Sequence, residues 1–209
     1  MNPKLGECQR SEEVMADIEL DVNRTALLMA DFHTEGMTEN PMVQERHTLD
    51  RAREVLNIAR RAGVFVAYIV VNFRSGYPEI SDMNQTFSAR KAAGAPPAAS
   101  PDALIHAAVL PLPTEPIITK HRVNAFFGTD LDMMLRAQGR DTLILMGHAT
   151  SGVILSTVRY AADADYRLIV VEDGCADRDP QVHDLLMEKV FPRQATVATA
   201  QDVVRALNS

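Results

Sequence analysis

The stretch DTLILMGHATSGVILSTVRYAADADYRLIVVEDG, residues 141–174, gives the clearest indication of the fold of this 209-residue chain. It opens with an apolar run over 141–148, continues with a helical pattern over 150–165 and closes with a second apolar run over 166–174. Strands that are hydrophobic on both faces are typical of parallel sheets covered by helices. The stretch therefore predicts a strand–helix–strand unit of such a sheet.

The same alternation continues in both directions along the chain. Four more strands are predicted, at 26–32, 64–71, 116–120 and 195–199. Four more helices are predicted, at 43–61, 129–138, 180–191 and 201–208. Residues 72–115 are rich in proline and glycine, and we expect them to be irregular. Repeated strand–helix alternation predicts one α/β domain over residues 1–209 with helices on both faces of a parallel sheet. Residues 1–22 are expected to be an N-terminal extension.

Composition excludes several classes of function. The formal charge is −7 without a basic stripe, which argues against nucleic acid as the main partner. No apolar run approaches the roughly 20 residues of a membrane span, and the N-terminus lacks the apolar core of a signal peptide. Neither GxGxxG nor GxxxxGK[ST] occurs, so no nucleotide cofactor is expected. We therefore expect a cytoplasmic protein that acts on a small molecule without a cofactor.

Ligands of such sheets bind at the carboxyl ends of the strands. The residues there are Asp31 and His33, Asn72 to Arg74, Lys120 to Arg122, His148 to Val153, and Glu172 to Cys175. Asp31 alone could cap a turn, and Lys120 alone could be a solvated surface residue. Together, a carboxylate facing an ammonium group stays ionised and can take or give a proton in a fixed place. The pair is the predicted centre of a small-molecule site.

Other polar residues have ordinary alternatives. Asp31 and His33 form an Asp-x-His pattern, but the segment 72–88 offers no further histidine, so we predict no metal. Arg74 and Arg122 could be surface charges, or could receive a substrate carboxylate together with Lys120.

The two cysteines and three further histidines are assigned no catalytic role. Cys8 and Cys175 lie far apart without a CxxC pattern, which argues against a disulfide framework or a zinc site. We expect Cys8 to be uninvolved and Cys175 to be a small buried hydrophobe. The surface or packing histidines are His106, His121 and His183.

Four stretches of the sequence resemble the isochorismatase-like hydrolases, also called the cysteine hydrolase superfamily. They read LLMADFHTEGM (27–37), TKHRVNAFFGTDLDMMLRAQGRDTLILMG (119–147), ATSGVILSTVRYAADADYRLIVVEDGCAD (149–177) and VFPRQATV (190–197). The resemblance implies a three-layer α/β/α sandwich with a six-stranded parallel sheet. It also implies a homo-oligomer, such as a dimer or tetramer.

Most members of that superfamily use an Asp–Lys–Cys triad. Asp31 and Lys120 match the first two members, and the position of the nucleophilic cysteine falls on Val153. Valine cannot form an acyl-enzyme. The resemblance further implies a cis peptide near His148–Ala149 beside an oxyanion hole, to which the N–H groups at the start of the following helix can contribute. The predicted substrate contacts are Phe32, Arg74, Arg122, Phe126, Ala149, Thr150 and Gly152.

Isochorismatases, a branch of this superfamily, carry a small residue in place of the cysteine and hydrolyse a vinyl ether. The resemblance thus implies a hydrolase of a small anionic metabolite in which Asp31 is the acid or base and water is the nucleophile. The bond cleaved is a vinyl ether or, as a weaker variant, the C–N bond of an amide or ureide. Two alternatives remain open: a catalytically silent binding protein, and a cysteine hydrolase whose nucleophile has been replaced.

Overall fold

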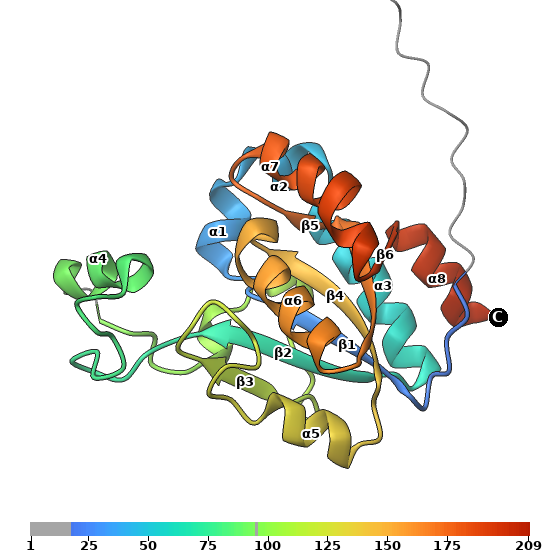
Figure 1. Cartoon of the computed structure of the whole chain (residues 1–209), viewed down its shortest axis with the longest axis horizontal. Coiled ribbons are helices and arrows are strands. Elements are labelled where there is room, and N and C mark those ends of the chain that lie inside the picture. The colour runs from blue at the N-terminus through green and yellow to red at the C-terminus, as the bar shows by residue number, and fades with distance from the viewer. Residues whose placement is uncertain (1–17, 95) are drawn as a thin grey trace, which may run out of the picture.

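Six parallel strands form the sheet of the computed structural model, which describes residues 18–94 and 96–209 (Figure 1). The sheet order is β3-β2-β1-β4-β5-β6. The strands are β1 (Thr25–Ala30), β2 (Phe65–Val71), β3 (Ile117–Lys120), β4 (Thr142–His148), β5 (Arg167–Ala176) and β6 (Thr196–Ala198). All six predicted strands are confirmed, with ends that differ by at most two residues.

The strand order reverses between β1 and β4, which are neighbours in the sheet. The chain first builds outward from β1 through β2 to β3, then returns to the other side of β1 with β4. Loops after β1 and β4 therefore diverge to opposite faces and leave a crevice at their carboxyl ends. Asp31 follows β1 and His148 ends β4, so both residues stand at this crevice.

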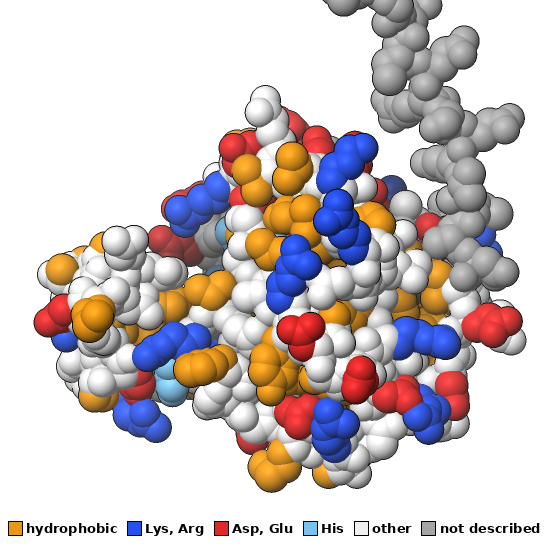
Figure 2. All heavy atoms as spheres, viewed as in Figure 1, with side chains coloured by type: hydrophobic (Ala, Val, Ile, Leu, Met, Phe, Trp, Pro, Cys, Tyr) orange, Lys and Arg blue, Asp and Glu red, His pale blue; other side chains and the backbone are white. Residues whose placement is uncertain are grey.

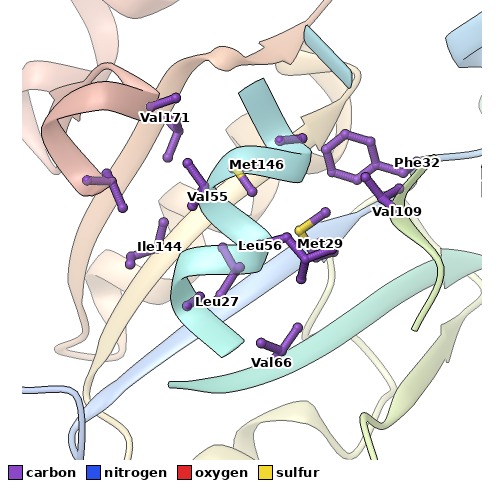
Figure 3. Packing of buried hydrophobic residues seen from close by; sticks show 14 of the residues in the cluster. Leu27, Met29, Phe32, Val55, Leu56, Val66, Val109, Ile144, Met146 and Val171 are labelled. Carbon is purple, nitrogen blue, oxygen red and sulfur yellow. The ribbon is translucent and has the colours of Figure 1, made fainter. Parts of the chain in front are cut away.

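Helices cover both faces of the sheet, as the three-layer α/β/α prediction requires. On one face α3 (Thr48–Ala62) and α8 (Ala200–Asn208) pack on alternate residues of the strands. Figure 3 shows Val55 and Leu56 of α3 against Leu27 and Met29 of β1. On the other face α5 (Leu131–Ala137) and α6 (Leu155–Asp163) cover the intervening strand residues.

Three predicted helices are interrupted. The helix expected over 43–61 is split into α2 (Pro41–Glu45) and α3, because His47 adopts a left-handed backbone with φ 54°. The helix expected over 150–165 begins with a π-helical turn, Thr150–Ile154, before α6. The helix expected over 180–191 is α7 (Pro180–Leu185) followed by a second π-helical turn, Leu186–Val190.

The segment 72–115 is more structured than predicted. It contains α4 (Gln85–Ala93), which begins at the side-chain cap of Asn84, and two 3₁₀ turns, Asp102–Leu104 and Ala107–Val109. Figure 1 shows α4 standing away from the sheet. A small cluster of Phe73, Tyr77 and Ile80, with Phe87 packed against it, supports this projecting part. A short helix α1 (Thr34–Glu39) after β1 was also not predicted.

Residues 1–17 of the predicted N-terminal extension lie outside the described residues. Ile18, Leu20 and Val22 are partly buried against the core on the α3 and α8 face. Within residues 18–94 and 96–209, no helix has the length and apolar character to cross a membrane. The cytoplasmic location and the homo-oligomer stay predictions.

Candidate active site

Asp31 and Lys120 meet at the carboxyl end of the sheet. Asp31 follows β1 with a left-handed backbone (φ 50°), and Lys120 is the last residue of β3. Although β2 lies between these strands, Lys120 Nζ is 2.7 Å from Asp31 Oδ2. Asp31 Oδ1 accepts a hydrogen bond of 3.0 Å from the N–H of Val71, at the end of β2. Partners from β2 and β3 therefore hold the carboxylate in one orientation.

The ammonium group of this pair is buried and the carboxylate is more open. The Lys120 side chain is 2% exposed, whereas that of Asp31 is 12% exposed. Lys120 Nζ also donates a hydrogen bond of 3.2 Å to the carbonyl oxygen of Arg122. A buried ammonium without an anionic partner would lower the stability of the fold, so Asp31 stabilises the charge of Lys120. In return, Lys120 fixes the position of the Asp31 carboxylate.

A polar cavity of about 620 Å³ opens above Asp31. Figure 2 shows the surface hollowed between the projecting part that carries α4 and the body, with acidic, basic and histidine side chains gathered there. Most of the lining comes from α1 and the residues beside it, with contributions from α4, β4 and the segment after β5. The charged or titratable lining residues are Asp31, His33, Glu35, Glu39, Arg90, His148 and Arg178.

Two histidines share the cavity with Asp31. His33 Nε2 lies 3.5 Å from Asp31 Oδ1. Burial lowers the pKa of His33 and also that of His148 below the ordinary value of 6.5. Both imidazoles are therefore neutral at pH 7, and each carries a hydrogen on one ring nitrogen and none on the other.

Val153 packs in the apolar core. Its side chain is 2% exposed and belongs to the apolar cluster on the α5 and α6 face. The turn that carries it is π-helical, and Gly152 within that turn has φ −97° and ψ −105°. Thr150 is buried and its hydroxyl lies 2.8 Å from His183 Nδ1. The bond between His148 and Ala149 is cis, as the resemblance implied.

The side chains predicted to contact substrate lie around the cavity rather than in its wall. Phe32 is buried in the α3-face core near Val109 (Figure 3), and Phe126 stacks on Tyr160 with 4.8 Å between ring centroids. Arg74 is 73% exposed and paired with Glu79. The lining residues also do not include Arg122, Ala149, Thr150, Gly152 or Val153. The structure brings together Asp31, Lys120 and His33, and it does not bring these further positions to the cavity surface.

Arginines that sequence reasoning missed occupy the cavity wall instead. Arg90 comes from α4, which the proline-rich surroundings of the segment obscured. Its cap residue Asn84 and the closing Gly94 were the available signals of a helix. Arg178 was missed because β5 extends to Ala176, two residues beyond the predicted end at 174. Glu35 and Glu39 also line the cavity, and the sequence analysis did not identify them because it did not predict the helix α1 that carries them.

Cys175 is not among the residues that line the cavity. It lies in β5 with 0% exposure, and burial raises the pKa of its thiol to about 12. The prediction of a small buried hydrophobe is confirmed, whereas Cys8 lies outside the described residues. Across the described ranges, no three His, Cys, Asp or Glu residues are grouped so that they could hold a metal ion.

Comparison with known proteins identifies the family of the chain. A "Probable isochorismatase" of Pseudomonas chlororaphis is 32% identical over 91% of this chain and 89% of that protein. The maleamate amidohydrolase of Pseudomonas putida is 29% identical over 88% of this chain and 87% of its own length. The crystal structure of N-carbamoylsarcosine amidase from Thermoplasma acidophilum superposes with a TM-score of 0.65 at 27% identity, covering 85% of this chain and 96% of that one. Residues 25–202 match the isochorismatase domain, and the chain belongs to this family of hydrolases.

Proposed function

We propose that this protein hydrolyses a small carboxylate-bearing metabolite, with Asp31 as the acid–base group and water as the nucleophile. The observation that carries the proposal is the Asp31 carboxylate, fixed by Lys120 at 2.7 Å and open to a polar cavity. A fixed carboxylate within reach of substrate and water is the requirement for general acid–base catalysis.

In this scheme the protonation state of Asp31 is restored at the end of each turnover. With a vinyl ether, the Asp31 carboxylate takes up a proton from solvent and gives it to the alkene carbon, and water adds to the resulting oxocarbenium ion. Asp31 accepts the proton that this water releases. The hemiketal then collapses to a ketone and an alcohol, its hydroxyl proton passing to the leaving oxygen. With an amide or ureide, the oxygen of water attacks the carbonyl carbon while the Asp31 carboxylate takes a proton from that water. Asp31 then passes this proton to the leaving nitrogen.

Water is the proposed nucleophile because the family's thiol position holds valine. Val153 has no side-chain lone pair, so no acyl-enzyme forms there. Cys175 cannot replace it, since a fully buried thiol with a pKa of about 12 neither reaches the cavity nor ionises at neutral pH. Every thiol within the described residues is thereby excluded as the nucleophile.

The charges of the cavity support an anionic substrate. Arg90 and Arg178 line it, and neither guanidinium forms an ion pair with any described residue. Guanidinium groups bind carboxylates with paired hydrogen bonds. Isochorismate, maleamate and N-carbamoylsarcosine, which the names of the three relatives denote, all carry a carboxylate. Glu35 and Glu39 line the same cavity and limit how much negative charge it accepts.

The test is product detection by mass spectrometry after incubation with isochorismate, maleamate and N-carbamoylsarcosine. We expect one of them to be consumed, and Asp31→Asn to lower kcat/KM at least about 100-fold because the proton-transfer group is lost. The control is Asp50→Asn, which changes an exposed carboxylate on α3. Turnover that survives Asp31→Asn would contradict the acid–base scheme, and the compound consumed identifies the bond type.

Val153 also favours a second candidate, a silent member of the family that binds a ligand without converting it. The variant Val153→Cys separates the two. The hydrolase proposal expects the unmodified protein to be active and the new thiol to be dispensable. Activity that appears only in Val153→Cys would instead indicate a binding protein, or a hydrolase whose nucleophile has been replaced.

A further inference from the structure

The amide orientation of Asn40 is fixed by three contacts. Asn40 Oδ1 accepts the N–H of Met42 at 2.9 Å and so caps α2. Asn40 Nδ2 donates to the carbonyl oxygen of Asp177 at 2.8 Å. Since the amide oxygen only accepts and the amide nitrogen only donates, rotating the group by 180° would break both bonds. The NH₂ group therefore faces His148, whose Nε2 lies 3.1 Å from Asn40 Nδ2.

This orientation sets the hydrogen on the His148 ring. Because Asn40 Nδ2 is a donor, Nε2 of His148 must accept and carries no hydrogen. The ring hydrogen is then on Nδ1, and a doubly protonated ring would direct one N–H against another. Burial favours the neutral ring in the same direction. The charged or titratable groups that act on His148 are Asp31 and Asp177, which favour its protonation, and Arg178 and His33, which oppose it.

Gly36 lies next to the Nδ1 edge of the His148 ring and has no side chain to cover it. A Cβ atom on Gly36 would lie 3.2 Å from His148 Nδ1 and 3.4 Å from Cε1, tighter than an ordinary contact. Both residues line the cavity that contains Asp31. Nδ1 has no hydrogen-bond partner among the residues of 18–94 and 96–209. The absent side chain at position 36 leaves this N–H open to a ligand.

We infer that His148 is a fixed neutral hydrogen-bond donor, held by Asn40, whose Nδ1–H binds an acceptor oxygen of the substrate in the same cavity as Asp31. The binding of a substrate oxygen by His148 rests on the proposed function, whereas the position of the hydrogen on the His148 ring does not. The inference narrows the substrate class to molecules that place a carbonyl or carboxylate oxygen beside His148 Nδ1. A substrate ammonium group at that point would set one hydrogen-bond donor against another.

Nitrogen-15 NMR of the histidine rings tests the tautomer directly. We expect the His148 spectrum at pH 7.5 to show a hydrogen on Nδ1 and none on Nε2, with the signals assigned by their loss in His148→Phe. A hydrogen on Nε2, or a doubly protonated ring, would overturn the inference whatever the activity of the protein.

The variant Asn40→Asp tests whether Asn40 imposes this state. A carboxylate still caps α2 but can only accept, so Nε2 of His148 should gain a hydrogen and the pKa of His148 should rise. Asn84→Asp is the matched control, because Asn84 caps α4 through the same kind of contact away from His148. An unchanged His148 spectrum in folded Asn40→Asp would show that another group fixes the ring. Should this variant not fold, the wild-type spectrum still decides the tautomer.

Maleate, a small dicarboxylate, is the probe for the donor role. Its addition should shift the His148 Nδ1 signal, and both Gly36→Ala and His148→Phe should weaken its binding about tenfold, the effect of one lost hydrogen bond. Absence of binding, or binding that leaves the His148 signals unmoved, would refute the donor role. With a substrate in hand, loss of turnover in Asp31→Asn but unchanged kcat/KM in His148→Phe would refute this inference and leave the proposed function intact.

Discussion

At the scale of single residues, the Asp31–Lys120 pair joins stability to the proposed chemistry. Two opposite charges have been taken out of water at the end of the sheet, with Lys120 Nζ 2.7 Å from Asp31 Oδ2. Desolvation of such a pair offsets much of its attraction, so the intact pair adds little net stability. Removal of one partner alone is different, because the remaining charge is then buried without compensation.

We therefore expect Lys120→Met to lower the free energy of unfolding by about 1–3 kcal/mol, because the Asp31 carboxylate loses its ammonium partner but still faces the polar cavity. The double variant Asp31→Asn with Lys120→Met should recover most of that loss. Urea denaturation of the wild type, the two single variants and the double variant measures the coupling. A loss in the double variant that equals the sum of the two single-variant losses would show that no charge coupling exists.

At the scale of elements, the close approach of β1 and β4 builds the crevice. Ala30 and Gly147 are paired in the register of these strands. A Cβ atom on Gly147 would lie 1.9 Å from the carbonyl oxygen of Ala30, and the φ of Gly147 is 149°. Only glycine fits at position 147 without moving one of the two strands. Asp31 directly follows Ala30, and His148 directly follows Gly147, so this close approach sets the positions of both residues.

Gly147→Ala should accordingly cost several kcal/mol of unfolding free energy, on the order of the largest single-residue effects. Gly63→Ala is the matched control. Gly63 closes α3 with φ 78° but has no atom within 4 Å of an added Cβ, so it should lose only about 1 kcal/mol through backbone strain. Urea denaturation compares the two; similar losses would mean that the β1–β4 contact can relax.

At the scale of the whole molecule, one buried histidine, His183, and two partly buried ones, His33 and His148, link stability to pH. Burial lowers the pKa of His33, His148 and His183 below 6.5 in the folded protein. An unfolded chain binds protons at these positions from about pH 6.5 downward, while the folded chain does not. The folded state is therefore most stable above pH 6.5 and loses stability as the pH falls toward the folded-state pKa values.

We expect the free energy of unfolding to be level above about pH 7.5, to begin to fall as the pH passes through 6.5, and to fall more steeply below it, by at most about 1.4 kcal/mol per pH unit for each histidine. Urea titrations at pH 7.5, 6.5 and 5.5 measure it. His148→Phe removes one contribution and should give a shallower decrease. Stability that rises on acidification across this window would contradict the burial of neutral imidazoles.

Local patterns of the sequence predicted the layers, the six strands and the edge of the sheet at which Asp31 and Lys120 lie. These features follow from local patterns, since a strand buried on both faces must be apolar at every position and a parallel connection needs a helix. Asp31 and Lys120 were also identified in this way, because each stands at the end of a predicted strand.

The side chains that surround Asp31 are brought there by contacts between distant parts of the chain. Arg90 and Arg178 line the cavity although they are 88 positions apart in the chain, and the predicted Arg74 turns to Glu79 instead. Where a strand stops depends on its neighbour: β5 continues to Ala176 because its last residues pair with β4 at His148. The tautomer of His148 likewise depends on Asn40, a residue 108 positions away. Such contacts are set by the packing of distant segments, which no local pattern of the sequence encodes.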